Sequence, residues 1–418
     1  MRIFKFGGAS VKDADGVRNL CEIITQFGGD SLVIVISAMG KTTNALEALV
    51  RRAYEGGEWK ERYEALATYH SDICNELFAQ VPEDVTNWLL QLKAALQTAE
   101  GSYEQFYDQI VPYGELLSTS IVYHQLSTQQ SCVWLDARKC VKTNSLYTEA
   151  NVEWELTEHY IARALPALLA QGPVITQGFI GSDASGKSTT LGREGSDFSG
   201  AIFAYCLQAE SLTVWKDVPG LLNADPKRFP QAELFHELSF QEVTELTYYG
   251  AKVIHPKTIR PLAQRNIPLY VRSFVDPTGT GTKISESEKV GVKPCFVFKD
   301  KQLLFTLRVR DNSFVDESKL VRVFQALDQA NVKINLMHSS ALTFTFCMDY
   351  SAVKLEKLQS SLTEEFHVLY NEGLHLATIK NYTPESFELL PPLGEVILEQ
   401  KTRNNFQVLY RPTESDEE

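Results

Sequence analysis

Hydrophobic and polar positions in the first part of the chain alternate between short buried strands and amphipathic helices. Residues 2–6 form an apolar run that ends at Gly7 and Gly8, and from Val17 onward apolar residues recur at helical spacing. Residues 31–38 are a continuous run rich in β-branched residues, which is typical of a strand buried on both faces of a parallel sheet. A strand, a glycine turn, a helix and a second strand form one βαβ unit, which predicts an α/β domain.

The same alternation continues as far as residue 274. A mainly helical region covers residues 44–130, in which Pro112 and Gly114 indicate a turn before a new helix. Further buried strands and helices are predicted beyond it, the strands at 132–136, 172–180, 212–216 and 268–274 and the helices near 154–170 and 238–250. This order predicts a doubly wound, mostly parallel sheet.

One stretch within this domain fits a phosphate-binding pattern. Residues 181–188 match G-x-x-x-x-G-K-S, the P-loop of many nucleotide-binding proteins. A P-loop opens directly into an apolar helix, whereas Thr189 to Arg193 continue as polar and turn-forming residues. We therefore predict a β-hairpin here and not a P-loop.

The pattern changes in the last third of the chain. The predicted elements are strands at 303–309, 333–337, 341–347 and 374–379, helices at 316–330 and 351–363, and a hairpin of 395–399 with 406–410. This order predicts a small α+β sandwich. Gly, Thr, Ser and Lys are prominent in 276–294, which favours a linker there.

We therefore divide the chain into two folded regions. The predicted parts are an α/β domain at 1–285, a linker at 286–298, an α+β region at 299–410 and an acidic, disordered tail at 411–418.

The segment 189–202 has the form of a glycine-rich loop that leads into a helix. Gly192 and Gly195 allow a tight turn, and Ser196 or Asp197 can cap the helix. A helix N-terminus favours an anion, and Arg193 adds a planar fork that suits a carboxylate or a phosphate. Because Asp197 lies beside them, the ligand would also carry a positive group, as an amino acid does. The alternative is a capped surface helix with ordinary loop charges.

Four further charged residues have two interpretations each. Lys5 closes a buried strand beside two glycines, where its ammonium could face a phosphate or simply reach solvent. Glu115 begins a helix, where it could stabilise the helix dipole or bind a substrate ammonium. Asp217 and Lys227 lie in turns that could face a nucleotide, although such turns are also common at surfaces.

Composition excludes several classes of protein. The length of 418 residues predicts two or three domains, and the net charge of −13 argues against binding of nucleic acid or anionic membranes. The last five residues carry four negative charges, so about −9 remains without them. Seven scattered cysteines indicate neither disulfides nor a zinc site. With no signal peptide and no apolar run of membrane-spanning length, we expect a cytoplasmic protein.

Five segments together resemble the aspartate kinases of the amino-acid kinase superfamily, in order and in spacing. They are Lys5-Phe6-Gly7-Gly8, Thr189 to Ser199, Trp215 to Gly220, Asp225-Pro226 and Gly250 to Pro256. The resemblance covers nearly all of residues 1–285 and implies the amino-acid kinase fold. Residues 299–363 look like the regulatory ACT unit of that family, whereas a second ACT unit is atypical or truncated.

The resemblance implies transfer of the γ-phosphoryl of ATP, with Mg²⁺, to the β-carboxylate of L-aspartate. The product would be 4-phospho-L-aspartate, the first step toward lysine, threonine, methionine and diaminopimelate. A carboxylate nucleophile is already ionised at neutral pH, so the reaction needs positioning and charge neutralisation and no general base.

The resemblance also implies roles for individual residues. Lys5, with Gly7 and Gly8 beside it, would neutralise the transferring phosphoryl. Arg193 would bind the aspartate α-carboxylate, and Glu115 and Asp197 its ammonium. The remaining predicted substrate residues are Ser37, Thr43 and Ser196, and the remaining predicted nucleotide residues are Lys216, Asp217, Leu222, Lys227 and Lys252.

Some positions depart from the family pattern. The family usually has Thr at Ala9 and Lys216, Tyr at Leu222 and Arg at Lys227. The last three positions are on the expected nucleotide side, so they bear on nucleotide preference. In the ACT-like region the implied effector positions are Asn335, where Asp is common, Ser339 and Ser340, with lysine or threonine as the effector. That region could also serve to form a homo-oligomer.

Two other functions remain open on the sequence. One is a superfamily relative that phosphorylates another amino acid, such as glutamate. The other is a catalytically weak amino-acid sensor, which the retention of Lys5 and the substrate-side residues disfavours.

Overall fold

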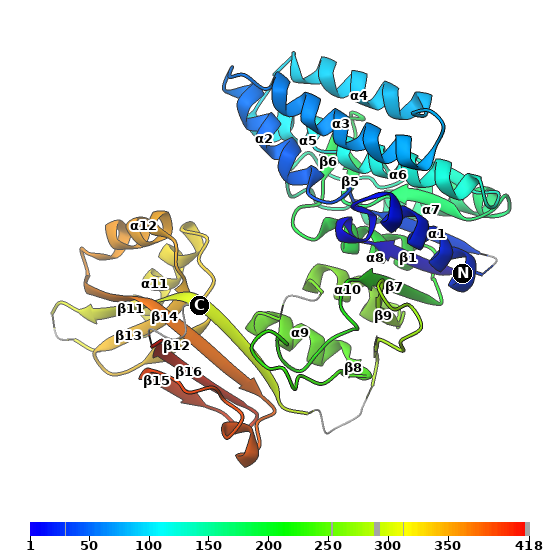
Figure 1. The fold of residues 1–418 in the computed structure, drawn as a ribbon. Coiled ribbons are helices and arrows are strands. Elements are labelled where there is room, and N and C mark those ends of the chain that lie inside the picture. Colours follow the sequence, from blue (N-terminus) through cyan, green and yellow to red (C-terminus); the bar gives the residue numbers. More distant parts are fainter. Residues whose placement is uncertain (30, 252–253, 288–292, 312, 414–418) are drawn as a thin grey trace. The chain divides into compact units, whose positions relative to one another are not determined.

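The computed structural model describes residues 1–29, 31–251, 254–287, 293–311 and 313–413, which form two compact units (Figure 1). The described part of the first unit comprises 1–29, 31–221, 234–244 and 254–287, and that of the second comprises 222–233, 245–251, 293–311 and 313–413. Two short segments that precede residue 285, 222–233 and 245–251, thus group with the second unit.

The first unit is built on an eight-stranded sheet in the order β3-β4-β2-β1-β7-β9-β10-β8. Its strands are β1 (Arg2–Phe6), β2 (Leu32–Ile36), β3 (Val133–Leu135), β4 (Val174–Gln177), β7 (Ser211–Lys216), β8 (Glu237–Ser239), β9 (Leu269–Ser273) and β10 (Thr282–Ser285). All neighbours pair in parallel except β9 and β10, which confirms the predicted mostly parallel sheet.

The strand β10 lies where the composition favoured a linker, so that prediction was wrong for Thr282–Ser285. Thr282 is fully buried, accepts a hydrogen bond from the Leu221 N–H and donates one to the Phe235 carbonyl. Pairing with the preceding strand β9 and the more distant β8 therefore decides the structure of a segment whose Gly, Ser and Thr content indicates a loop.

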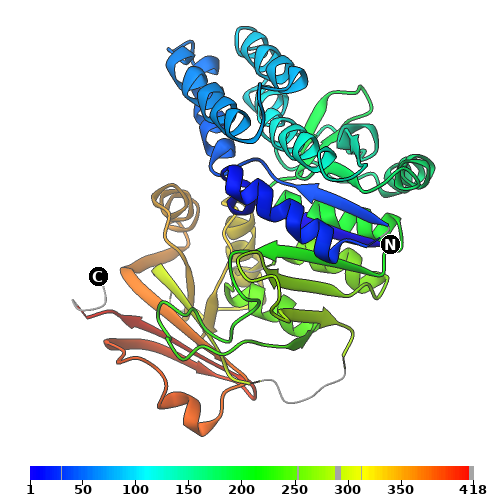
Figure 2. The ribbon, with the colours of Figure 1, turned by 45° about the vertical axis from the view of Figure 1, so that its right-hand side comes forward.

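Helices cover both faces of this sheet. They are α1 (Ala14–Phe27), α2 (Thr42–Tyr54), α3 (Lys60–Leu77), α4 (Glu83–Leu96), α5 (Tyr103–Ile110), α6 (Tyr113–Ser127), α7 (Trp154–Leu169), α8 (Gly195–Cys206) and α10 (Pro256–Gln264), with short 3₁₀ turns η1 (Gly8–Val11) and η2 (Ala137–Lys139). The helix α9 (Phe240–Tyr249) follows β8. Figure 2 shows α1, in dark blue, lying along one face of the sheet.

Alternate residues of each strand face opposite helical layers. Phe4 and Phe6 pack into a core with buried side chains of α1 to α6. Lys5 points to the other face, because a Cβ built on Gly200 of α8 would lie 3.6 Å from the Lys5 Cβ. The topology thus places the Lys5 side chain between the sheet and the N-terminal half of α8.

The stretch with the P-loop pattern forms a hairpin. The strands β5 (Ile180–Ser182) and β6 (Ser188–Thr190) pair antiparallel, and the turn between them is closed by Asp183, whose Oδ1 accepts hydrogen bonds from the Ser185 and Lys187 N–H groups. This confirms the predicted hairpin.

The second unit is a six-stranded sheet in the order β12-β13-β11-β14-β16-β15, with every neighbouring pair antiparallel. Its elements are β11 (Cys295–Val309), α11 (Glu317–Gln329), β12 (Leu336–Ser339), β13 (Thr343–Asp349), α12 (Ala352–Leu362), β14 (Phe366–Lys380), the 3₁₀ turn η3 (Pro384–Phe387), β15 (Glu395–Lys401) and β16 (Asn405–Arg411). The predicted α+β region and its terminal hairpin are confirmed.

Two strands of this sheet are much longer than predicted. Both β11 and β14 run for 15 residues, and the register between them shifts near Lys299 to Gln302. The polar residues at this irregularity interrupt the alternating pattern of β11, which is why the sequence placed the strand start at residue 303.

Among the residues that the structure describes, no helix is both long and apolar enough to cross a membrane.

Candidate active site

A cavity of about 700 Å³ opens in the first unit at the carboxyl ends of β1 and β2, beside the N-terminus of α8. It is lined by Lys5, Gly8, Ser37, Ala38, Gly40, Thr43, Glu47, Tyr107, Glu115, Thr148, Glu149, Phe179, Gly192, Arg193, Glu194, Gly195, Ser196, Asp197 and Lys216. The carboxyl ends of parallel strands are the usual place for ligand binding in α/β sheets. The fold thus brings together nine predicted site residues: Lys5, Gly8, Ser37, Thr43, Glu115, Arg193, Ser196, Asp197 and Lys216.

Asp197 holds two lysines at one side of this cavity. Its Oδ1 lies 2.6 Å from the Lys5 Nζ, and its Oδ2 lies 3.3 Å from the Lys216 Nζ. Lys5 pairs with Val214 across the parallel β1 and β7 strands, so Lys216, two residues further along, projects on the same face of the sheet. The result is a cluster of two cations and one anion, in which Lys5 and Asp197 are buried and Lys216 is partly exposed.

The charge of this cluster keeps Asp197 ionised. Burial by itself would raise the pKa of Asp197, but the charges of Lys5 and then Lys216 outweigh it and hold the pKa below its ordinary value. The sequence assigned Asp197 to the substrate ammonium and Lys216 to the nucleotide side. In the structure both carboxylate oxygens of Asp197 face the two lysines.

Glu115 forms a buried wall of the cavity. It lies in the first turn of α6 and is 2% exposed; its Oε1 accepts a hydrogen bond of 3.1 Å from the Ala38 N–H, while its Oε2 is buried without a hydrogen-bond partner among the described residues. Burial raises the pKa of Glu115 to about 8, although the Ala38 N–H and the charge of Lys5 act in the opposite direction. A buried carboxylate with one unsatisfied oxygen is suited to a cationic ligand group.

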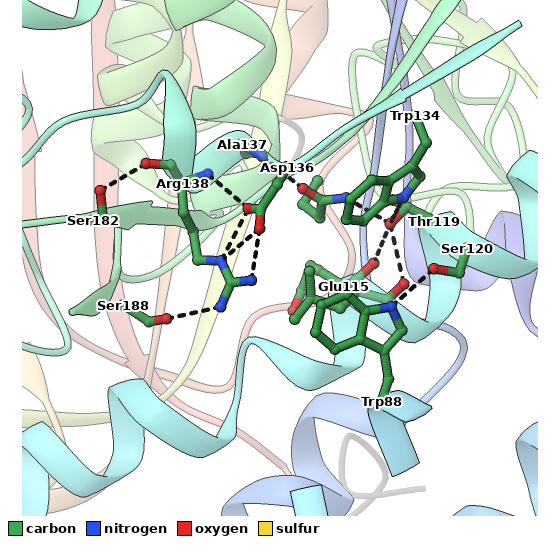
Figure 3. A network of polar contacts seen from close by, with 12 residues as sticks. Trp88, Glu115, Thr119, Ser120, Trp134, Asp136, Ala137, Arg138, Ser182 and Ser188 are labelled. Atoms are coloured by element: carbon green, nitrogen blue, oxygen red, sulfur yellow. Dashed lines mark hydrogen bonds and ion pairs between the residues drawn. The ribbon is translucent and has the colours of Figure 1, made fainter. Parts of the chain in front are cut away.

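A network of polar side chains fixes the helix that carries Glu115 (Figure 3). Thr119 donates to the Glu115 carbonyl oxygen at 2.8 Å, and its hydroxyl oxygen accepts from the Trp134 indole N–H at 3.0 Å and from the Gln177 amide at 2.7 Å. The strands β3 and β4 are therefore bonded to α6 directly below the cavity, which limits the movement of Glu115.

The glycine-rich loop differs in detail from the prediction. The helix α8 begins at Gly195, and the residue at its N-cap position is Glu194, in a left-handed conformation (φ 53°, ψ 26°) and without a side-chain capping bond. The prediction that Ser196 or Asp197 caps this helix was therefore wrong. Both residues lie in its first turn, and the Asp197 carboxylate is drawn to the two lysines instead.

The glycines after β1 allow the backbone to approach the cavity closely. A Cβ on Gly8 would lie 2.6 Å from the Ala38 carbonyl oxygen, and the Gly40 N–H donates to the Gly8 carbonyl at 2.9 Å. A Cβ on Gly7 would stand 3.6 Å from the Lys5 Nζ. A side chain at Gly8 would therefore clash with the backbone, whereas a Cβ at Gly7 would only be in ordinary contact with the Lys5 ammonium.

The other predicted nucleotide residues lie elsewhere. Asp217 is exposed after β7 and does not line the cavity, and Leu222 and Lys227 belong to the second unit. Lys252 lies outside the described residues.

The predicted effector residues lie in the second unit. Asn335 is buried, and its amide bonds to the Lys299 Nζ, the Gln302 Oε1 and the Asp349 Oδ1 at 2.7–2.9 Å. Ser339 and Ser340 are exposed at the turn between β12 and β13.

Eight residues that line the cavity were not singled out in the sequence: Ala38, Gly40, Glu47, Tyr107, Thr148, Glu149, Phe179 and Glu194. Most come from helices and loops whose sequence gives no sign of their neighbours. Thr148 and Glu194 have positive φ angles, and Asp108 binds the backbone of Thr148 and Thr190, but none of this is visible in the sequence pattern.

Comparisons with known proteins show which family the chain belongs to. A family model described as the amino acid kinase family matches residues 1–273. The lysine-sensitive aspartokinase 3 of Escherichia coli (strain K12) is 32% identical over 395 residues, which cover 90% of this chain and 86% of that protein.

Solved structures of the E. coli protein have the same fold. The structure of E. coli aspartokinase III in complex with aspartate and ADP (R-state) matches with a TM-score of 0.83 and 28% identity, and the structure with lysine and aspartate (T-state) with a TM-score of 0.81 and 28% identity. Each match covers 98% of this chain and 96% of that one. The chain therefore belongs to the amino acid kinase family and, within it, to the aspartokinases.

Proposed function

We propose that the chain transfers the γ-phosphoryl of ATP to the β-carboxylate of L-aspartate and releases 4-phospho-L-aspartate, the first step toward lysine, threonine, methionine and diaminopimelate. The observation that carries the proposal is the cluster of Lys5, Asp197 and Lys216 in the same cavity as Arg193 and Glu115. The E. coli relative that binds aspartate and ADP supports this choice of substrates.

In this reaction Lys5 and Lys216 neutralise the phosphoryl group as it moves from ATP to the carboxylate. Phosphoryl transfer spreads negative charge over the phosphoryl oxygens, so cations fixed before the reaction lower its barrier. Asp197 is a positioning residue because it holds both ammonium groups at 2.6 and 3.3 Å and keeps them from turning to solvent.

The amino-acid substrate binds opposite this cluster. Arg193 is exposed at the mouth of the cavity and has no ion pair with a described carboxylate, so its guanidinium is available to the substrate α-carboxylate. Glu115, with its unsatisfied Oε2, receives the α-ammonium. The polar side chains of Ser37, Thr43 and Ser196 complete the ring.

Mg²⁺ enters this reaction with ATP as part of the substrate. The described residues contain no group of three or more His, Cys, Asp or Glu arranged to hold a metal ion, and Asp197 is taken by lysines. This donor set fits an ion held by the nucleotide phosphates and water. Gly7 and Gly8, which follow β1 beside Lys5, are the further proposed nucleotide contacts in this unit.

Regulation by an amino acid and assembly into a homo-oligomer belong to the same proposal. A relative described as lysine-sensitive supports lysine over threonine as the effector, and the proposed effector site is in the second unit at Asn335, Ser339 and Ser340.

The proposed location of the protein is the cytoplasm. All seven cysteines are free thiols, which fits the reducing environment of that compartment.

The test traps the acyl phosphate product with hydroxylamine in the presence of ATP and aspartate. Hydroxamate should form with aspartate and not with glutamate, and it should be lost in Lys5→Ala and Arg193→Ala. Lys12→Ala and Arg163→Ala remove exposed cations outside the cavity and should retain wild-type activity. A folded wild-type protein that gives no hydroxamate with aspartate would overturn the proposal.

A further inference from the structure

The residue after Arg193 has an unusual backbone conformation. Glu194 stands at φ 53° and ψ 26°, in the left-handed region, which glycine, asparagine and aspartate enter far more readily than glutamate. Its carbonyl accepts from the Asp197 and Phe198 N–H groups at 3.1 and 3.3 Å, so the backbone turn starts α8. A glycine could make this turn with less strain because it has no Cβ. The Glu194 side chain does not compensate for the strain by capping the helix, since it forms no capping bond.

Glu194 lines the same cavity as the catalytic cluster. The residue is partly exposed, but its Oε2 is buried and has no hydrogen-bond partner among the described residues. Strain that contributes nothing to capping and leaves a carboxylate oxygen buried without a partner is typical of a functional position.

A second carboxylate oxygen in this cavity has the same lack of a partner. Glu115 Oε2 is also buried without a hydrogen bond among the described residues, and it comes from a different helix, α6. The lysines that line the cavity are ion-paired with Asp197. Each glutamate thus has one carboxylate oxygen available to a hydrogen-bond donor of a ligand.

We propose that Glu194 is a substrate-specificity residue that binds the α-ammonium of the amino-acid substrate together with Glu115. An ammonium has three N–H donors and can bond to more than one carboxylate at once. Arg193 would bind the α-carboxylate of the same substrate, so two adjacent residues of one loop would bind the two charged groups of the amino acid. In this assignment Asp197 forms ion pairs with Lys5 and Lys216 and does not bind the substrate ammonium. The inference rests on the proposed function, since it assigns one contact of the aspartate substrate.

The test compares two replacements that share only the loss of charge. Glu194→Gln keeps the size of the side chain, and Glu194→Gly removes both the side chain and the left-handed strain. Both should raise the KM for aspartate roughly 10- to 100-fold, the value of a hydrogen bond to a charged group, while the KM for ATP and kcat change less than threefold. Glu194→Gly should melt no lower than the wild type. Glu155→Gln, an exposed glutamate in the first turn of α7, is the matched control and should match the wild type.

Calorimetric titration separates this inference from the proposed function. Aspartate should bind the wild type more tightly than succinate, which lacks the ammonium, and Glu194→Gln should reduce that preference at least fivefold. If the wild type prefers aspartate to succinate but forms no acyl phosphate, the proposed function would be overturned, while the assignment of Glu194 to the substrate ammonium would stand. Unchanged KM and unchanged preference in both folded variants, or no binding of aspartate to the wild type, would overturn the assignment of Glu194.

Discussion

Glu115→Gln should make the first unit more stable, by an amount that increases with pH. The replacement keeps an oxygen to accept the Ala38 N–H at 3.1 Å and removes a charge that is buried in the fold. The pKa of the Glu115 carboxyl is about 8 in the folded protein against an ordinary 4.5, so folding takes up a proton between these two values. Because the unfolded chain binds fewer protons there, the stability of the wild type falls as pH rises through this window.

The magnitude follows from the two pKa values. A difference from 4.5 to about 8 corresponds to a cost of about 5 kcal/mol when the carboxyl is fully ionised, above pH 8. At pH 5 the same group lowers the free energy of unfolding by only about 1 kcal/mol. The difference in unfolding free energy between Glu115→Gln and the wild type should therefore widen by about 4 kcal/mol between pH 5 and pH 9.

Urea unfolding followed by tryptophan fluorescence measures this difference in the unit that contains Glu115. All five tryptophans lie in the first unit: Trp59, Trp88, Trp134, Trp154 and Trp215. Each protein is unfolded at several pH values without substrate, and Glu155→Gln serves as the control, with no change in its difference from the wild type. A gap between Glu115→Gln and the wild type that stays constant from pH 5 to pH 9 would refute the reasoning.

Three further variants test the roles of single polar groups. Asp197→Asn should lower kcat at least 100-fold, about 3 kcal/mol, because the two lysines lose their anchor; a rise in the KM for aspartate with kcat intact would instead place Asp197 on the substrate ammonium. Asp108→Ala should raise the KM for aspartate about tenfold, since its carboxylate holds the backbone of Thr148 and Thr190 at 3.0 and 2.8 Å beside the cavity, and a KM equal to that of the wild type would contradict this. Asn335→Ala should destabilise the second unit by about 2–4 kcal/mol, measured as faster hydrogen exchange in β11 and β13, and unchanged exchange would show that the buried amide network contributes little.

The local pattern of the sequence determined the architecture and the identity of several site residues. Short β-branched runs separated by helical periodicity specify a parallel sheet because each strand must be apolar on both faces. The polar residues after Lys187, where a P-loop would open into an apolar helix, distinguished a hairpin from a P-loop. Lys5, Arg193 and Glu115 stood out because each is a charged residue at the end of a buried or glycine-rich element, where a ligand can reach it.

Only the tertiary structure shows which of these residues form ion pairs with one another. The pairing of β1 with β7 sets Lys5 opposite Val214 and so places Lys216 on the same face, near a carboxylate that comes from α8. The sequence around either strand does not predict this register, because the register depends on which strands become neighbours in the sheet.

The same limit applies to the glycine-rich loop and to the linker segment. The sequence contains Glu194, but only the folded backbone shows that it is left-handed and that its Oε2 is buried. Likewise, Thr282 looks like part of a linker until two distant segments pair with it. Periodicity and turn propensity are properties of a few neighbouring residues and can be read along the chain. Ion pairs, buried unsatisfied atoms and edge-strand pairing arise from residues far apart in sequence, so they exist only in the tertiary structure.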